Sequence, residues 1–320
     1  MRYHPFNPHR FERIPTLRGA HRPAGFRPSS AIYPLVMLAL SAVLYGCAGL
    51  GQRVDFASLP EGAPAVTDIL RDLAANDDRI SNFRGAGTFT IESPEFDAVK
   101  KFRGSIKFQR PADLFVQGNH RITNIPLFKL TCVGAEFLME FPGSQDQSFY
   151  QLEGERYDDV PFSVSPSDIV REMFLPEEWD EIGRKDARVI AFDPEKNIAT
   201  LSIGPSAAPR RWIEVARIDP ENPTWVVVRN VRLDETGRVI AETRLAGYNA
   251  IGTAMFPTEI DAWFPTEATR MTFKMRNIRL NTDLPPDTFD LRTRALELQL
   301  AEIRPGDKEG KVVPLTRRAH

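Results

Sequence analysis

The chain has 320 residues, with 41 basic and 43 acidic side chains, five histidines and two cysteines. Two cysteines cannot build a disulfide framework, and a composition that is 26% charged and 42% hydrophobic is typical of a globular protein. The balanced charge excludes a chain that binds nucleic acid through an overall basic surface. The charges are unevenly placed, however, because residues 1–30 hold six arginines and a single acid, Glu12.

An apolar segment without charge follows this basic leader, from Ala31 to Tyr45. As a helix it would span roughly 22 Å at ~1.5 Å per residue, which is short of the ~30 Å hydrocarbon core of a bilayer. A basic leader and a short apolar core predict an export signal over residues 1–46. The alternative is an uncleaved anchor, with Cys47 as an ordinary thiol.

The residues Leu44-Tyr45-Gly46-Cys47-Ala48 resemble the lipobox of bacterial lipoproteins. The resemblance implies cleavage before Cys47, lipidation of that cysteine, and attachment to the membrane through its acyl chains. Attachment by two or three chains is effectively permanent, at about 0.8 kcal/mol per buried methylene. Ala48 after the cysteine implies a location at the outer membrane, facing the periplasm.

Removal of the leader changes the character of the chain. The remaining 274 residues carry 35 basic and 42 acidic side chains, because six arginines and one glutamate are lost, and the net charge becomes −7. We expect no nucleic-acid partner for such an acidic body. Only two histidines remain, His120 and His320, and Cys132 is the one thiol besides Cys47.

Few of these residues favour catalysis. No cysteine or histidine spacing typical of a metal site occurs, so no metal or other cofactor is predicted. His120 lies in a predicted turn and Cys132 in an apolar run, which favours a surface histidine and a buried thiol. The carboxylate pair Asp77-Asp78 is interpreted as a solvated turn. The sequence therefore predicts a protein that is not an enzyme, with a hydrolase as a distant alternative.

The first predicted element of the mature chain is a helix. Residues 47–63 are small and polar and predict a tether. From Pro64 to Ile80, apolar residues recur at helical spacing, which predicts an amphipathic helix with one stripe to bury.

The pattern then changes to the period of two that is typical of strands. Phe83–Ile91 and Phe102–Gln109 alternate apolar and polar residues, which predicts one apolar and one solvated face. Turn sequences separate further predicted strands. These are Leu114–Gly118, Leu127–Val133, Glu136–Phe141, Ser148–Leu152, Arg188–Phe192, Ala199–Ile203, Arg211–Ile218, Thr224–Asp234, Arg238–Tyr248, Thr258–Trp263 and Arg270–Leu280.

Two helical segments accompany the strands. Ser165-Pro166-Ser167-Asp168 offers an N-cap and a proline at the first helical position, and predicts a helix that Leu175-Pro176 ends or kinks. Ala295–Ile303 predicts a short amphipathic segment before a polar tail.

Three short motifs carry a resemblance to the LolA/LolB-like superfamily of periplasmic lipoprotein carriers and receptors. They are the glycine-led strand that ends in Arg110-Pro111, the Gly-centred turn and apolar strand over Val133–Pro142, and the closing segment Leu284–Asp290. The resemblance covers residues 64–291 and leaves a short helix and polar tail at 292–320. It implies a mainly β fold with helices, in which a curved antiparallel sheet forms an unclosed (half) β-barrel with a helical lid or plug.

The same resemblance implies a function. The concave sheet face would bind acyl chains of lipoproteins or other lipids, for transfer or localisation at the outer membrane, and Arg110 would hold the lid closed through bonds to helical backbone. The alternative for Arg110 is a rim arginine before a turn. The predicted lipid-binding residues, for which core packing is the alternative, are Phe89, Phe102, Ile106, Phe108, Leu114, Val116, Ile169, Met173 and Phe174. An envelope-stress or interaction module that binds a periplasmic protein is the competing function.

Overall fold

The computed structural model describes residues 62–94, 99–134, 136–144, 148–152, 179, 182, 186–218, 224–303 and 312–314. These residues belong to a unit that spans 56–320 and that is described by itself. The predicted leader, Cys47, most of the tether and the helix predicted over residues 165–175 lie outside the described residues. Within the described part of the chain, no helix is long and apolar enough to cross a bilayer.

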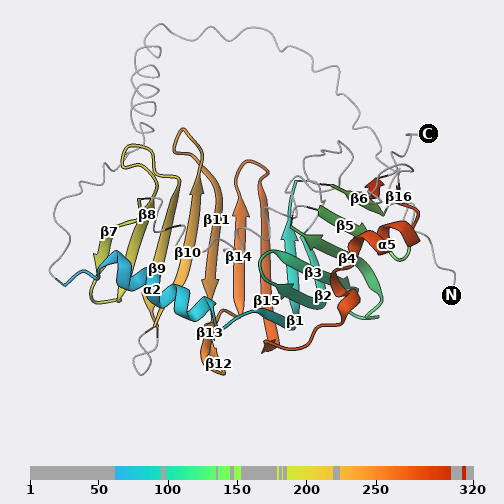
Figure 1. Ribbon diagram of the computed structural model, residues 1–320, viewed down its shortest axis with the longest axis horizontal. Coiled ribbons are helices and arrows are strands. Elements are labelled where there is room, and N and C mark those ends of the chain that lie inside the picture. The colour runs from blue at the N-terminus through green and yellow to red at the C-terminus, as the bar shows by residue number, and fades with distance from the viewer. Residues whose placement is uncertain are drawn as a thin grey trace, which may run out of the picture. The chain divides into compact units, whose positions relative to one another are not determined.

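One antiparallel sheet of thirteen strands dominates the unit (Figure 1). Its strands are β1 (Asn82–Glu92), β2 (Lys100–Gln109), β3 (Asp113–Asn119), β4 (Pro126–Val133), β5 (Glu136–Glu140), β6 (Phe149–Gln151), β7 (Arg188–Asp193), β8 (Ile198–Ile203), β9 (Arg211–Arg217), β10 (Trp225–Leu233), β11 (Val239–Ala246), β14 (Glu259–Phe264) and β15 (Thr269–Leu280). Each coincides closely with a predicted strand, because alternation marks the strands and turn residues bound them.

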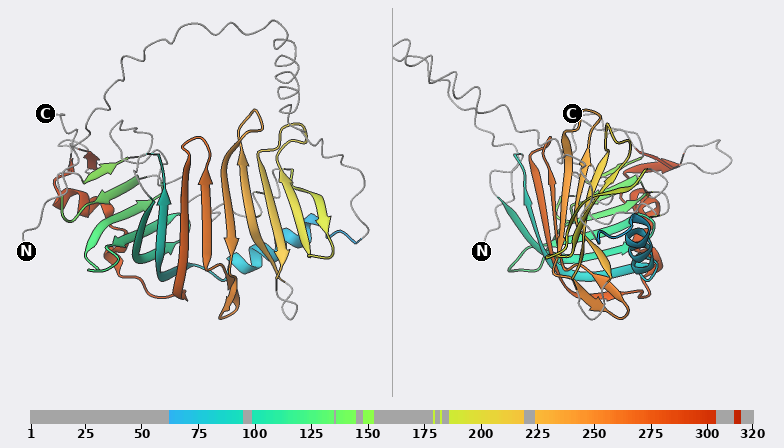
Figure 2. Two further views of the ribbon diagram at one scale, coloured as in Figure 1. Left: turned by 180° about the vertical axis from the view of Figure 1, so that it is seen from behind. Right: turned by 90° about the vertical axis from the view of Figure 1, so that its left-hand side faces the viewer.

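The sheet consists of two meanders joined side by side. Its strand order is β6-β5-β4-β3-β2-β1-β15-β14-β11-β10-β9-β8-β7, so β1 pairs with both β2 and β15. Although β6 and β7 follow one another among the described strands, they form the two opposite edges, and the curved sheet does not close (Figure 2). The prediction of an unclosed, curved antiparallel sheet is confirmed.

Helix α2 (Val66–Asp77) covers one face of the sheet, which we call the inner face. It contacts β10 and β13 (Ala254–Phe256), and it buries Ile69 and Leu73 in the main core. The predicted helix extended to Ile80, but α2 ends at Asp77, and Ile80 enters the core from the turn that follows. A hairpin of β12 (Asn249–Ile251) and β13, which the sequence did not predict, lies beside the helix (Figure 1).

A second helix covers the opposite face at the other end of the sheet. The 3₁₀ helix η2 (Pro286–Phe289) leads into α5 (Leu291–Glu297), which contacts β4 and β5. Leu291 and Ala295 form a small separate core with Leu138 and Tyr150. The prediction of one helical segment over Ala295–Ile303 is wrong: α5 ends at Glu297, Gln299 has a positive φ, and Ala301–Ile303 is strand β16, which pairs with β17 (Val312–Pro314).

Candidate functional site

The inner face of the sheet is apolar along rows that cross both meanders. Leu245, Ile260, Phe273, Phe89 and Phe102 are consecutive register partners on β11, β14, β15, β1 and β2. The rings of Phe89 and Phe273 meet edge to face, with centroids 4.8 Å apart. Because alternate residues of a strand point to one face, these partners form a continuous apolar surface.

The structure brings six of the predicted lipid-binding residues together on this face. Ile106 and Val116 are register partners, as are Phe108 and Leu114. Phe102 is half-buried and the others are buried. Ile169, Met173 and Phe174 lie outside the described residues. Contact of these side chains with lipid stays a prediction.

Two glycines make room for aromatic rings on the inner face. Gly104 and Gly118 are register partners on β2 and β3. A Cβ on Gly118 would collide with the ring of Phe128, and one on Gly104 would meet Phe89 at 2.9 Å as well as the carbonyl of Gln117. Glycine in a strand interior often marks such a close approach. The aromatic rings therefore pack directly against glycine backbone.

Four groups, which we call the clamp, join the end of α2 to the end of β2. Arg110 Nε donates to the carbonyl oxygen of Ile80 at 2.8 Å, and Arg110 Nη2 lies 3.1 Å from Asp77 Oδ2. The indole Nε1 of Trp179 donates to the same Oδ2 at 2.9 Å. Arg110, predicted to hold a helical lid through backbone bonds, thus contacts the backbone just beyond α2 and the last side chain of the helix. That these contacts act as a latch remains a proposal.

Asp77 is the residue of the clamp whose environment differs most from the sequence prediction. Its side chain is 26% exposed rather than solvated, so the interpretation of Asp77-Asp78 as a solvated pair is wrong for Asp77. Loss of hydration raises the pKa of this carboxyl, and the charge of Arg110 together with the donated bonds of Trp179 and Arg110 opposes the shift. No local pattern of residues indicates this environment, because the partners of Asp77 come from distant segments of the chain.

Further polar contacts tie the end of α2 to the β12–β13 hairpin. The amide of Asn76 forms two bonds with the backbone of Met255: Nδ2 donates to the carbonyl oxygen at 3.1 Å and Oδ1 accepts from the amide at 2.8 Å. Arg79 Nη1 donates to the carbonyl oxygen of Thr253 at 2.6 Å. The C-terminal end of α2 is therefore fixed on several sides.

A cavity of about 80 Å³ lies between α2 and the inner face, next to the clamp. Apolar side chains of α2 and the sheet line it, and the clamp residues Asp77, Arg110 and Trp179 close one side. This volume is well below the roughly 300–1,000 Å³ that is usual for sites that bind small ligands. The structure is thus a closed form, in which an elongated apolar ligand would need α2 to move.

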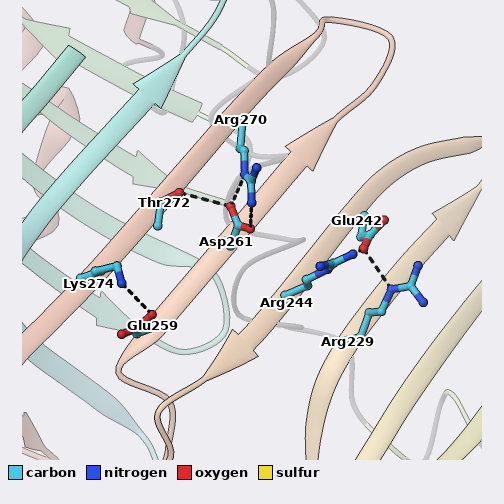
Figure 3. A network of polar contacts seen from close by, with 8 residues as sticks. All are labelled: Arg229, Glu242, Arg244, Glu259, Asp261, Arg270, Thr272 and Lys274. Carbon is cyan, nitrogen blue, oxygen red and sulfur yellow. Dashed lines mark hydrogen bonds and ion pairs between the residues drawn. The ribbon is translucent and has the colours of Figure 1, made fainter. Parts of the chain in front are cut away.

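The outer face of the same strands is charged. Figure 3 shows Glu242 of β11 beside Arg229 and Arg244. Glu242 Oε1 lies 3.0 Å from Arg229 Nε and 2.8 Å from Arg244 Nε. Asp261 and Arg270 form a two-bond ion pair on β14 and β15. The pKa of the Asp261 carboxyl is lowered by its hydrogen bonds from Arg270. The predicted division into a solvated and an apolar face is confirmed here.

One end of the sheet exposes apolar side chains. In the connection between β3 and β4, Ile122 is 88% exposed and Ile125 is 52% exposed, and Arg121 between β3 and Ile122 is exposed as well. Leu127 at the start of β4 and Val99 before β2 are also exposed and belong to the same end of the strands. A large apolar side chain left almost entirely in water is a candidate contact for another molecule.

The two residues considered for catalysis lie in unrelated surroundings. Cys132 is buried in the core, and burial raises the pKa of its thiol. His120 is exposed, and its Nδ1 lies 3.0 Å from the hydroxyl of Thr123. The predicted buried thiol and surface histidine are confirmed. Among the described residues, no group of three or more His, Cys, Asp or Glu side chains is arranged to hold a metal ion.

Comparison with known proteins gives likeness in structure but not in sequence. No protein-family model matches the chain, and no curated protein matches it. A DUF1329 family protein from Desulfovibrio piger is 13% identical, covers 71% of this chain and 98% of its own, and superposes with a TM-score of 0.50. This likeness shows the fold.

Two further solved structures are similar over nearly the same length. A LolA superfamily protein from Nitrosomonas europaea is 14% identical, with 71% of this chain and 98% of that chain covered and a TM-score of 0.46. A domain from Vibrio parahaemolyticus named for outer-membrane lipoprotein sorting is 7% identical, with 70% and 97% covered and a TM-score of 0.46. The fold of the chain is LolA/LolB-like, as the sequence predicted.

Proposed function

We propose that the protein binds acyl chains, of lipoproteins or of other lipids, between α2 and the inner face of the sheet, and passes them on without covalent chemistry. The observation that carries the proposal is the cavity beside the clamp, where an apolar sheet face meets a helix held by a few polar contacts. An acyl chain that displaces the helix replaces one hydrocarbon contact with another, so the net free energy of exchange is small.

In this proposal the clamp sets the balance between the closed and the open form. The Asp77–Arg110 pair exists only while α2 lies on the sheet, and the bond from Arg110 to the Ile80 carbonyl holds the turn that follows the helix. Hydrogen bonds to charged groups contribute about 1.5–3 kcal/mol each when formed in partly buried surroundings. A few such bonds stabilise the closed form enough to keep the inner face covered in water, and they remain weak enough for a ligand to offset.

The location we propose is the periplasmic side of the outer membrane, with attachment through acylated Cys47. The basic leader, the short apolar core and the lipobox resemblance support it. The exposed side chains of Ile122 and Ile125, with Arg121 next to them, suit a second, transient contact with the membrane surface. Such a contact would bring the unit close to the lipids that it exchanges.

The experiment uses the chain from residue 47 onward with Cys47→Ala, so that no acyl group of the protein itself is present. We expect lipid to co-purify with it, detected by mass spectrometry, and the delipidated protein to bind the fluorescent fatty acid cis-parinaric acid. A protein that carries no lipid and does not bind the probe would refute the proposal.

The competing function is an interaction module on the same fold. Among the described strands, β6 and β7 form the two edges of the sheet, and a peptide can add to an edge strand as a further strand. Failure of lipid binding would favour this function.

A further inference from the structure

A second hollow adjoins the cavity beneath α2. It is an open groove of about 520 Å³, within the range of roughly 300–1,000 Å³ that is usual for sites that bind small ligands. We call it the access groove. Besides residues that it shares with the cavity, it is lined by Ile218, Val228, Ala246, Gly247, Asn249 and Ala250.

Three side chains separate the access groove from the cavity. Leu245, Tyr248 and Met255 line both hollows, so each forms part of the wall between them. Leu245 and Met255 are buried, whereas Tyr248 is half-buried. A single layer of side chains therefore separates the solvent-exposed groove from the closed cavity.

The groove lies where two strands of the sheet diverge. The register between β10 and β11 reaches Arg229 and Arg244, and strand residues 225–228 and 245–246 have no register partner across this gap. β11 still pairs with β14 up to Ala246, and β10 still pairs with β9 down to Trp225. Pairing between β10 and β11 is thus interrupted at this end of the two strands.

A side chain spans the gap in place of the missing ladder. The hydroxyl of Tyr248 donates to the carbonyl oxygen of Val227. The loss of hydration at this position raises the pKa of Tyr248, and the nearby charge of Asp77 adds to the effect. The hydroxyl therefore stays protonated and able to donate at neutral pH. One side-chain hydrogen bond joins the two strand ends here.

Gly247 lets the backbone turn on the β11 side of the groove. Gly247 has φ +63°, a conformation that glycine adopts without strain, and a Cβ at this position would collide with the hydroxyl of Thr258. The residues on either side of Tyr248 are small or exposed, including Ala246 and Ala250. The lining therefore combines small residues with the apolar surface of Ile218 and Val228.

The structure assigns the access groove as the route by which acyl chains enter and leave the cavity, past Tyr248 and between the ends of β10 and β11. This inference rests on the proposed function. Separation at the gap breaks the one hydrogen bond described across it, whereas lifting the end of α2 breaks the clamp and the bonds of Asn76 and Arg79 at once. The gap is therefore the entrance that costs least, and α2 moves only to make room for the chain inside the cavity.

A route differs from a binding site in its effect on rates. Narrowing a route slows association and dissociation equally and leaves the dissociation constant unchanged, whereas damage to a site changes the dissociation constant. We therefore propose stopped-flow measurements with cis-parinaric acid on the mature chain with Cys47→Ala. Ala250→Trp fills the groove from an exposed position, and Ala207→Trp, in the exposed turn between β8 and β9, is the matched control.

For Ala250→Trp we expect both rate constants to fall by about tenfold, which is within the spread of rates among variants of one site, with an unchanged Kd. Tyr248→Phe keeps the ring and removes the bond to Val227, so both rate constants should rise. Ala207→Trp should match the parent protein. Wild-type rates in both groove variants, or a changed Kd with an unchanged association rate, would overturn the route. Absence of probe binding by the parent would instead refute the proposed function itself.

Discussion

Arg110 and Asp77 connect the end of β2 to the end of α2, with 3.1 Å between the guanidinium Nη2 and the carboxylate Oδ2. The same guanidinium donates from Nε to the carbonyl oxygen of Ile80. A single side chain thus holds both the last residue of the helix and the backbone just beyond it. Because the contact with Asp77 requires α2 to lie on the sheet, its energy belongs to the closed form alone.

The first prediction concerns Arg110→Leu. Loss of its contacts should lower the free energy of unfolding by about 1–2 kcal/mol, reduced for partial exposure of the pair. The same loss shifts the population toward the open form, so cis-parinaric acid should bind about five- to thirtyfold more tightly. Denaturant unfolding and equilibrium titration measure the two effects.

Arg244→Leu is the matched control, since Arg244 is 63% exposed on the outer face and pairs with Glu242. We expect its probe affinity to equal that of the parent. If Arg110→Leu also left the affinity unchanged, Arg110 would be a rim arginine before a turn and not a latch.

Trp179 provides a second test of the clamp. Its indole Nε1 donates to Asp77 Oδ2, and the ring is buried in the main core. Trp179→Phe keeps most of the apolar contact and removes the donor, so the free energy of unfolding should fall by about 1–3 kcal/mol. Probe affinity should rise as in Arg110→Leu. A variant that is destabilised but binds the probe as the parent does would show that Trp179 serves packing alone.

The raised pKa of Asp77 predicts a pH dependence of known sign. Burial makes the folded state bind the proton of the Asp77 carboxyl more tightly than the unfolded state does. The contribution of this proton to stability is therefore full at pH values below the ordinary pKa of 3.8, and it is lost as the pH rises through the folded-state pKa. Asp77→Asn lacks this titration. The stability of the parent relative to Asp77→Asn should therefore decrease as pH rises over that window, measured by urea unfolding at several pH values. A relative stability that increases with pH would show that the ion pair with Arg110 outweighs burial.

The sequence predicted the faces of the sheet well and the clamp only in part. Alternation along β1 and β2 decides which side chains share a face, so Phe89 and Phe102 could be placed together before their register was known. Arg110 was found from its motif and parity. Asp77 and Trp179 could not be paired with it, because their contacts join segments far apart in the chain and no local pattern reports such proximity.

The gap between β10 and β11 could not be predicted from the sequence either. The whole run Arg238–Tyr248 alternates like a strand, yet pairing with β10 ends at Arg244, because the backbone turns at Gly247 toward an unpredicted hairpin. Tyr248 bridges the gap only because its hydroxyl reaches the carbonyl oxygen of Val227 on β10. Strand propensity is local, whereas the interruption of a ladder depends on both strands.

The exposed connection between β3 and β4 predicts a change in membrane contact without a change in fold. Ile122→Asp replaces a side chain that is 88% exposed, so the free energy of unfolding should stay within about 0.5 kcal/mol of the parent. Flotation of the mature Cys47→Ala chain with anionic phospholipid vesicles should decrease, because the substitution removes apolar surface and adds a negative charge. Thr123→Asp adds the same charge beside it without removing apolar surface. Equal flotation of the two variants would attribute the effect to charge alone.

The last prediction concerns Gly118, one of the two glycines against which aromatic rings of the inner face pack. Gly118→Ala places a Cβ against the ring of Phe128, which itself meets Phe102 edge to face with centroids 5.2 Å apart. Since the ring must shift in a packed region, we expect a loss of about 1–3 kcal/mol in the free energy of unfolding. Gly143→Ala, where a Cβ meets no atom within 4 Å, should have little effect. Equal stability of the two variants would mean that Phe128 has room to move, and the inner face would then be adaptable even in the closed form.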